Sequence, residues 1–319
     1  MRTKLGYVLA FLGAFLLVVA VLAQFYAPGQ VKKTPIDADS LTNLSGRAIL
    51  NGPTGFDSFP VLAFSTTKAD SDKSTSDVVL FQYSSCVVRD EGGIDGCVSS
   101  DDPDNRLITA STDTFAADRV SALAVNDFKG LPAGALPHEG LLNKWPFDAE
   151  KKTYPYWDGT INKAVDAVFQ RTATINGTEV YVYKVNIVEE PIEIAEGVPG
   201  LYSDVEEISI EPRTGAFIKV DRTVTQTGAD GTPVLYLQIV YTDDEIKDSL
   251  KEANDAADKL HLLTSTVPLI GYIGGGICLI AGLALLLLGR PEDDEVDASS
   301  GTVAGGSGGR RVSTEKASV

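Results

Sequence analysis

The sequence has few of the side chains on which catalysis and metal binding usually depend. Among its 319 residues there are only two histidines and three cysteines. Neither His138 nor His261 has a further His, Cys or carboxylate at a spacing typical of a metal site. The motifs of serine hydrolases, zinc proteases and nucleotide-binding α/β domains do not occur. We therefore predict a non-enzymatic protein with no metal and no cofactor.

Positive charge is also scarce. The chain has 27 Lys and Arg against 44 Asp and Glu, so its formal net charge is −17 at pH 7. Like charges repel, which argues against nucleic acid or anionic lipid headgroups as the main partner. An acidic surface also keeps a protein soluble, and this simpler explanation of the charge stays open.

Charge is absent altogether from two long stretches, residues 6–26 and 267–289. About 20 apolar helical residues span a hydrocarbon core of ~30 Å, so both stretches predict transmembrane helices. Arg2 and Lys4 precede the first stretch and favour a cytoplasmic N-terminus. Val21-Leu22-Ala23 would suit signal-peptide cleavage, but the apolar run is long and aromatic residues follow it. We expect a retained anchor, with cleavage as the alternative.

The two stretches divide the chain into six parts. The tail after the second stretch is acidic and then rich in Gly and Ser, so it cannot bury a core. We expect a plasma-membrane protein with both termini in the cytoplasm. The predicted parts are a cytoplasmic N-terminus (1–5), a transmembrane helix (6–26), a β-rich extracytoplasmic domain (27–242), an amphipathic stalk helix (243–266), a second transmembrane helix (267–289) and a disordered cytoplasmic tail (290–319).

Small residues recur at a spacing of four inside both apolar stretches. They are Gly6, Ala10 and Ala14 in the first stretch and Gly271 and Gly275 in the second. Small residues at this spacing let helix backbones approach closely in lipid. We predict that these faces pair, within one chain or between copies in a homo-oligomer. The alternative is that Gly and Ala are simply common in membrane helices.

Strand-like patterns dominate the region between the two stretches. Asn176-Gly177, a strong two-residue hairpin signal, joins residues 167–175 to residues 178–188. Pro212-Arg213-Thr214-Gly215 and Gly228-Ala229-Asp230-Gly231 mark the turns that follow. The predicted fold class is therefore mainly β, an antiparallel meander, with one N-terminal and one C-terminal transmembrane α-helix.

Two of the cysteines flank a loop rich in Gly. The loop lies between Cys86 and Cys97 and reads as a turn between two strands, which would bring the two thiols together. A disulfide needs an oxidising compartment, and an extracytoplasmic domain provides one. We predict a Cys86–Cys97 disulfide, with two unpaired buried thiols as the alternative.

Large aromatic residues are concentrated in one short segment of the domain. They are Trp145, Phe147, Tyr154, Tyr156 and Trp157. Because aromatic side chains bury large areas, they can pin a loop onto a sheet. The alternative is that they form the lip of an apolar ligand pocket.

Several features together resemble the actinobacterial PorA-type porin family. They are the opening Met1-Arg2-Thr3-Lys4 with its apolar helix, the Trp157-Asp158 region, the Pro212-Arg213-Thr214-Gly215 hairpin and the Gly-rich second helix. The likeness covers nearly the whole chain up to Arg290. It implies an actinobacterial cell-envelope protein that forms a channel in the outer cell wall, and its motifs name no catalytic residue.

Three hypotheses for the function follow. The first is the porin-like channel or transport role implied by the resemblance. The second is a membrane-anchored lipid-binding or lipid-transfer domain with an apolar tunnel, because the layout also resembles the scavenger-receptor class B arrangement. The third is an envelope assembly scaffold. They differ in their partners, which are ions, a lipid or other apolar ligand, and other envelope proteins.

Overall fold

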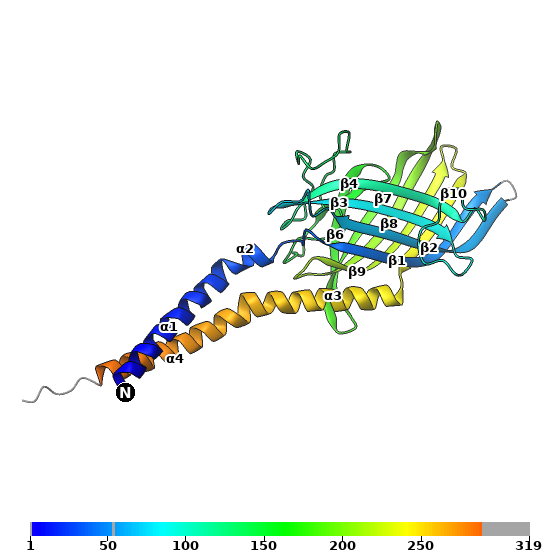
Figure 1. The fold of residues 1–319 in the computed structure, drawn as a ribbon. Coiled ribbons are helices and arrows are strands. Elements are labelled where there is room, and N and C mark those ends of the chain that lie inside the picture. Colours follow the sequence, from blue (N-terminus) through cyan, green and yellow to red (C-terminus); the bar gives the residue numbers. More distant parts are fainter. Residues whose placement is uncertain (1, 53–54, 289–319) are drawn as a thin grey trace, which may run out of the picture.

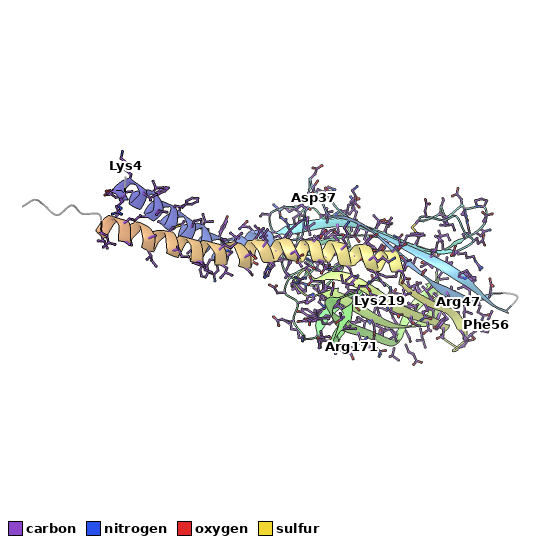
Figure 2. The ribbon with its side chains drawn as sticks, turned by 90° about the horizontal axis from the view of Figure 1, so that it is seen from below. Lys4, Asp37, Arg47, Phe56, Arg171 and Lys219 are labelled. Carbon is purple, nitrogen blue, oxygen red and sulfur yellow. A yellow bond between two sulfur atoms is a disulfide. The ribbon has the colours of Figure 1, made fainter. Side chains whose placement is uncertain are left out.

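The computed structural model describes residues 2–52 and 55–288. Two helical rods project from a strongly curved β-sheet (Figure 1). Lys4 in the first helix and Phe56 in a β-hairpin lie at opposite ends of the molecule (Figure 2). The tail predicted for residues 290–319 lies outside the described residues.

The rods are formed by the two ends of the chain. At the N-terminus, α1 (Arg2–Phe25) is followed by the short helix α2 (Ala27–Val31). At the other end, α3 (Asp243–His261), the π-helical turn η1 (Leu262–Thr266) and α4 (Val267–Leu287) follow one another without a break. Both α1 and the rod that contains α4 are long and apolar enough to cross a membrane. The membrane association of the chain rests on these two helices.

The two apolar helices pack against each other in antiparallel orientation. A Cβ atom added at Gly13 would lie 2.5 Å from the backbone nitrogen of Leu279 and 2.7 Å from the carbonyl oxygen of Gly275. Such contacts are impossible, so only glycine lets the backbones approach this closely. The other close neighbours along the pair are Gly6 with Gly282 and Ala20 with Gly271.

Ten strands form one antiparallel sheet in the order β4-β3-β2-β1-β10-β9-β8-β7-β6-β5. Every neighbouring pair except β1–β10 is consecutive in sequence, as expected for a meander. The predicted fold class, mainly β with one helix at each end, is confirmed. The strands are β1 (Asp39–Gly52), β2 (Gly55–Ala69), β3 (Val78–Arg89), β4 (Leu107–Asp118), β5 (Tyr154–Asp158), β6 (Lys163–Ile175), β7 (Thr178–Ala195), β8 (Val198–Glu211), β9 (Ala216–Gly228) and β10 (Pro233–Tyr241).

The sheet curls into a half-barrel with two differently covered faces (Figure 1). Side chains alternate between the faces of a strand. In β7, Val182 packs with Leu250 of α3 on the outer face, whereas Tyr183 and Val185 join the main core on the inner face. That core contains apolar residues from both halves of the sheet, β1 to β4 and β5 to β10. Figure 2 shows α3 crossing the outer face, where Arg171 and Lys219 lie.

The connector between β4 and β5, residues 119–153, is pinned to the inner face. The backbone nitrogen of Trp145 donates a hydrogen bond to the carbonyl oxygen of Gly215 over 2.9 Å, and that of Leu141 donates to Pro155 over 2.8 Å. Trp145 and Leu141 are completely buried. The connector therefore fills part of the half-barrel.

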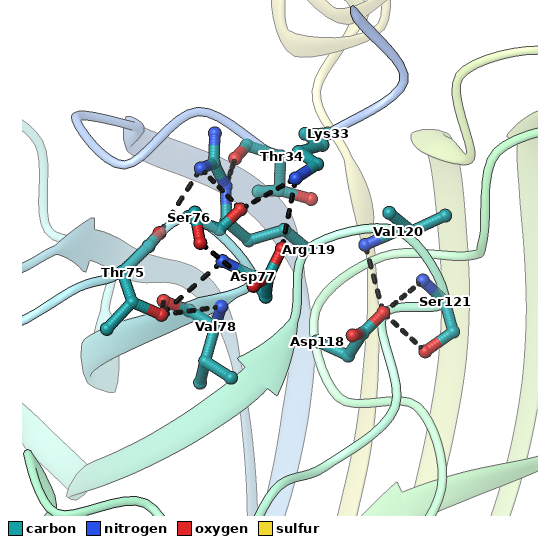
Figure 3. A network of polar contacts seen from close by, with 10 residues as sticks. All are labelled: Lys33, Thr34, Thr75, Ser76, Asp77, Val78, Asp118, Arg119, Val120 and Ser121. Carbon is teal, nitrogen blue, oxygen red and sulfur yellow. Dashed lines mark hydrogen bonds and ion pairs between the residues drawn. The ribbon is translucent and has the colours of Figure 1, made fainter. Parts of the chain in front are cut away.

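The segment that leaves α2 is tied to both ends of this connector. The backbone nitrogen of Thr34 donates to the carbonyl oxygen of Arg119 over 2.8 Å. The guanidinium of Arg119 donates to the carbonyl oxygens of Thr34 and Ser76 over 2.6 and 3.1 Å (Figure 3). Near the other end of the connector, Lys32 forms an ion pair with Asp148. The membrane helix and the connector are thus joined at two points.

The predicted disulfide between Cys86 and Cys97 is present. Cys86 is buried within β3, but Cys97 lies in the loop that precedes β4 and not in a second strand. Ile94 and Val98 of this loop pack near Cys86, so the bond fastens the loop to the sheet.

Candidate functional site inside the half-barrel

Five polar side chains gather on the inner face of the half-barrel, within an otherwise apolar core. We call them the charged cluster: Asp158 at the end of β5, Tyr202, Asp204 and Glu206 on β8, and Arg222 on β9. Residues two apart on a strand point to the same face, which places the three β8 side chains together. The sheet register sets Arg222 directly opposite Glu206.

Arg222 is the centre of the hydrogen bonds in the charged cluster. Its Nε donates to Asp204 Oδ2 over 2.8 Å, and its Nη2 donates to Asp158 Oδ2 over 3.2 Å. The same Nη2 donates to the hydroxyl of Tyr202 over 2.7 Å. The Tyr202 hydroxyl lies 2.9 and 3.1 Å from the two aspartate oxygens, which it reaches as a donor. The guanidinium of Arg222 and the hydroxyl of Tyr202 are therefore the hydrogen-bond donors to the carboxylates of Asp158 and Asp204.

Two acceptors in the charged cluster have no partner among the described residues. Glu206 forms no hydrogen bond or ion pair there, although only 6% of the residue is exposed. The second oxygen of Asp204, Oδ1, is likewise buried without a hydrogen bond. Buried polar atoms are nearly always hydrogen-bonded in proteins, so the free Oδ1 of Asp204, two positions before Glu206 on β8, is a feature that needs a cause.

Burial sets the protonation of these acids. It raises the pKa of Glu206 to about 7, and the charges of Asp204 and Asp158 add to this effect against the opposing charge of Arg222. Burial also raises the pKa of Asp204, despite its hydrogen bond to Arg222. Burial alone would lower the pKa of Arg222, but the neighbouring acids raise it well above its usual value. The guanidinium therefore stays charged while Glu206 changes its charge near neutral pH.

The charged cluster is open to solvent at one point. The side chain of Arg222 keeps 30% of its exposure, whereas its partners Asp158 and Asp204 keep 5% and none. Tyr156, whose pKa burial raises and the charge of Glu206 raises further, is also only half-buried. The charged cluster is therefore not completely sealed from solvent at Arg222 and Tyr156.

Several hydrophobic residues lie against the inner core and are only partly buried, namely Leu50 of β1, Ile108 of β4, Ile161 after β5, Ile192 of β7 and Leu235 of β10. They belong to, or directly follow, strands in both halves of the sheet. The inner face therefore offers apolar surface beside a polar centre.

The structure brings three of the five aromatic residues of the predicted pocket lip together. Trp145 is completely buried and its ring centroid lies 5.0 Å from that of Tyr183. Tyr154 is buried in the same core, and the ring centroid of Tyr156 lies 5.5 Å from that of Trp145. The two others lie elsewhere: the ring of Trp157 is 4.8 Å from that of His138, and that of Phe147 is 3.7 Å from Lys144 Nζ.

The predicted helix-packing residues are also placed by the structure. Gly6, Gly271 and Gly275 are buried between α1 and α4, and Ala10 lies against Gly282. Ala14 is exposed instead. In α1 the buried small residues recur every seven residues, at Gly6, Gly13 and Ala20, which is the period of supercoiled helices.

Known proteins resemble this chain over most of its length. The family described as "Porin PorA" matches residues 5–284. The chain belongs to the PorA porin family. The predicted resemblance is confirmed, and the protein is a porin-like membrane protein.

Individual relatives are distant. A "Porin PorA" of Corynebacterium amycolatum is 24% identical over 232 residues, which are 59% of this chain and 58% of that protein. The match thus spans a little over half of the relative's length. A crystal structure of a putative outer membrane lipoprotein-sorting protein domain from Vibrio parahaemolyticus covers 76% of this chain and 97% of its own, at 11% identity and a TM-score of 0.16. So low a score carries no argument about the fold.

Proposed function

We propose that this PorA-family protein is a non-catalytic, two-pass membrane protein whose half-barrel binds an amphipathic ligand such as a lipid. In this proposal α1 and α4 span the plasma membrane, both termini are cytoplasmic and the half-barrel lies outside. Arg2 and Lys4 at the N-terminus support this orientation. The Cys86–Cys97 disulfide supports it too, because it forms in an oxidising compartment.

The observation that carries the proposal is the composition of the inner face. An amphiphile has a polar head and an apolar chain, and the half-barrel presents a matching pair of surfaces. The charged cluster, in which Arg222 and Tyr156 keep some exposure, is the polar surface for the head. The partly buried Leu50, Ile192 and Leu235 are contacts for the chain. Ligand sites commonly combine a mostly apolar concave lining with a few polar groups of this kind.

The proposal is tested by filling the apolar part of the inner face. Leu235→Trp adds bulk on the inner face, and Tyr236→Trp adds bulk at the next residue, which points outward and is exposed. The full-length proteins are purified from membranes and extracted with organic solvent, and the extract is analysed by mass spectrometry. We expect an amphiphile to co-purify with the parent and with Tyr236→Trp, and most of it to be lost from Leu235→Trp.

Two outcomes of this test contradict the proposal. One is a parent protein that carries no amphiphile. The other is an equal amount of amphiphile in both tryptophan variants. A melting curve of each variant shows whether the added bulk has disturbed the fold, because overpacking a core costs ~1–3 kcal/mol.

A channel is the second candidate, and the family description favours it. A pore would need several copies, because α1 and α4 of one chain are in direct contact. Their remaining surfaces are apolar, with exposed side chains such as Phe11 and Ile280. An apolar lining is a poor path for ions, which is why the amphiphile ranks first.

Single-channel recording in planar bilayers separates the two candidates. Gly13→Leu would force α1 and α4 apart, whereas Gly276→Leu is the matched control, because a side chain at Gly276 meets no atom within 4 Å. We expect no discrete conductance from any of the three proteins once incorporation is verified. Discrete steps from the parent and Gly276→Leu that are absent from Gly13→Leu would instead establish the channel.

A further inference from the structure

We propose that the charged cluster selects a ligand whose head carries a positive charge, in particular a protonated primary amine. This inference rests on the proposed function, since it names the head of the amphiphile that the half-barrel binds. It follows from three observations on the inner face: the balance of charge, the position of Glu206 and the chemistry of the unfilled acceptors.

The first observation is that negative groups outnumber positive ones. Asp158, Asp204 and Glu206 face a single guanidinium, that of Arg222. The two aspartates already share it, at 3.2 and 2.8 Å. A buried charge is costly unless another charge or several hydrogen bonds compensate it. The charged cluster therefore contains more acidic than basic side chains, so the negative charge is not fully compensated within it.

The second observation is that Glu206 is left without its natural partner. Arg222 lies directly opposite it in the β8–β9 register, where oppositely charged side chains normally pair. Arg222 instead turns its donors to Asp204, Asp158 and the hydroxyl of Tyr202. The carboxylate of Glu206, a residue that is 6% exposed, and the buried Oδ1 of Asp204 accept no hydrogen bond from the described residues and lie two positions apart on β8.

The third observation concerns the chemistry that these acceptors can take. An ammonium group supplies three donors and one positive charge, and so complements two carboxylate oxygens. A phosphate would be repelled by the three acids. Among the residues that the structure describes, no three Asp, Glu, His or Cys side chains come close enough to hold a metal ion. The geometry therefore favours an organic cation over an anion or a metal.

Such a ligand would couple binding to protonation. Besides burial, the charges that shift the pKa of Glu206 are those of Arg222 of β9, Asp204 of β8 and Asp158 of β5. The titratable hydroxyls near it are those of Tyr156 of β5 and Tyr241 of β10, whose pKa values the charge of Glu206 helps to raise, with Tyr83 of β3 beside them. Because the pKa of Glu206 is raised to about 7 by burial, part of the free protein is protonated there at neutral pH. A bound cation favours the carboxylate and expels the proton. Binding therefore strengthens as the pH rises from 6 to 8.

The test compares three amphiphiles with one chain length. Octylammonium, octyl phosphate and octyl glucoside are titrated by calorimetry into the full-length protein in nanodiscs from which co-purified ligand has been removed, and empty nanodiscs are subtracted. At pH 8 we expect octylammonium to bind about tenfold more tightly than octyl glucoside, as one charge-assisted hydrogen bond allows. Titration in buffers of different ionisation enthalpy is expected to show proton release.

A pair of variants assigns the selectivity to Glu206. Glu206→Gln keeps the shape and removes the charge, and we expect it to abolish the preference for octylammonium. Glu193→Gln is the matched control, because Glu193 is exposed on the neighbouring strand β7. It should leave the preference unchanged. Melting curves verify that both variants fold.

The possible failures are distinguishable. If octyl glucoside binds as tightly as octylammonium, or if Glu206→Gln keeps the preference, the inference about the head is wrong while the amphiphile site stands. If octyl phosphate binds most tightly, Arg222 dominates and the inference is again wrong. If none of the three binds, the proposed function itself fails.

Discussion

Two neighbouring regions of the inner face are built in opposite ways. Around Trp145 the contacts are between rings: its centroid lies 5.5 Å from that of Tyr156, 5.0 Å from Tyr183 and 5.4 Å from Phe217. Around Arg222 the contacts are between charges. Tyr156 belongs to both regions. Its ring stacks on Trp145, and burial together with the charge of Glu206 raises the pKa of its hydroxyl.

The two regions differ in what they contribute to stability and in what they leave available for binding. Burial of large rings is a dependable source of stability. A buried charge network adds little net stability, because its attraction is offset by the cost of desolvation. The Trp145 region is closed, whereas the Arg222 region keeps exposed surface and unfilled acceptors. We therefore assign the first to stability and the second to binding.

The largest expected effect is from removing the ring at the centre of the closed region. Trp145→Ala should lower the free energy of unfolding by about 4 kcal/mol, measured by urea denaturation followed by circular dichroism. Trp145→Phe should cost clearly less, since the indole Nε1 has no hydrogen-bond partner to lose. A cost below about 1 kcal/mol for Trp145→Ala would contradict the assignment of the Trp145 region to stability, because the rings would then contribute no more than surface residues do.

Removing the single cation of the open region should have the next largest effect. Arg222→Met leaves Asp158 and Asp204 buried without their partner, which should cost about 3 kcal/mol at pH 8. The cost should shrink at lower pH, because burial raises the pKa of Asp204 and its protonation removes one of the two uncompensated charges. Denaturation curves at pH 8 and at lower pH check this. A loss independent of pH would mean that Arg222 acts by packing alone.

The smallest effect is a gain in stability. Since the pKa of Glu206 is raised from 4.5 to about 7, the folded state holds the proton more tightly than the unfolded state. The stability of the parent should therefore fall as the pH rises from about 4.5 to 7. Glu206→Gln should remove this slope and be more stable at pH 8, by on the order of 2 kcal/mol. Glu193→Gln should follow the parent at every pH, and any gain there would show that the effect is not local.

The sequence was sufficient to predict the strands that end in strong turns. Asn176 and Gly177 adopt positive φ angles of 46° and 88°, as the hairpin signal requires. The sequence pattern does not predict strand β1, because Asp39–Gly52 mixes Ser, Thr, Asn and Gly without a clear alternation of apolar and polar residues. Strand β1 pairs along its whole length with β2 and also with β10, which lies almost 200 residues later in the chain and leaves no local signal.

The candidate site was not predictable from local pattern. Tyr202, Asp204 and Glu206 alternate with Ser203 and Val205, so neither face of β8 reads as a uniform core face. Arg222 and Asp158, which form a hydrogen bond, are 64 residues apart in sequence. The pairing register of β8 and β9 places Arg222 beside the three polar side chains of β8. The interpretation of the aromatic segment as a loop pinned to the sheet agrees with the burial of Trp145. The pocket lip formed by that segment stays a prediction.

The unbroken rod from α3 to α4 sets a distance. The 19 residues of α3 and the five of η1 rise roughly 36 Å at 1.5 Å each, a little more than the hydrocarbon thickness of a bilayer. With α4 in the membrane as proposed, the strand end that joins α3 is held that far from the lipid surface. Because α3 lies against the outer face of the sheet, the half-barrel extends alongside this rod and leads from the membrane surface into the aqueous layer of the envelope.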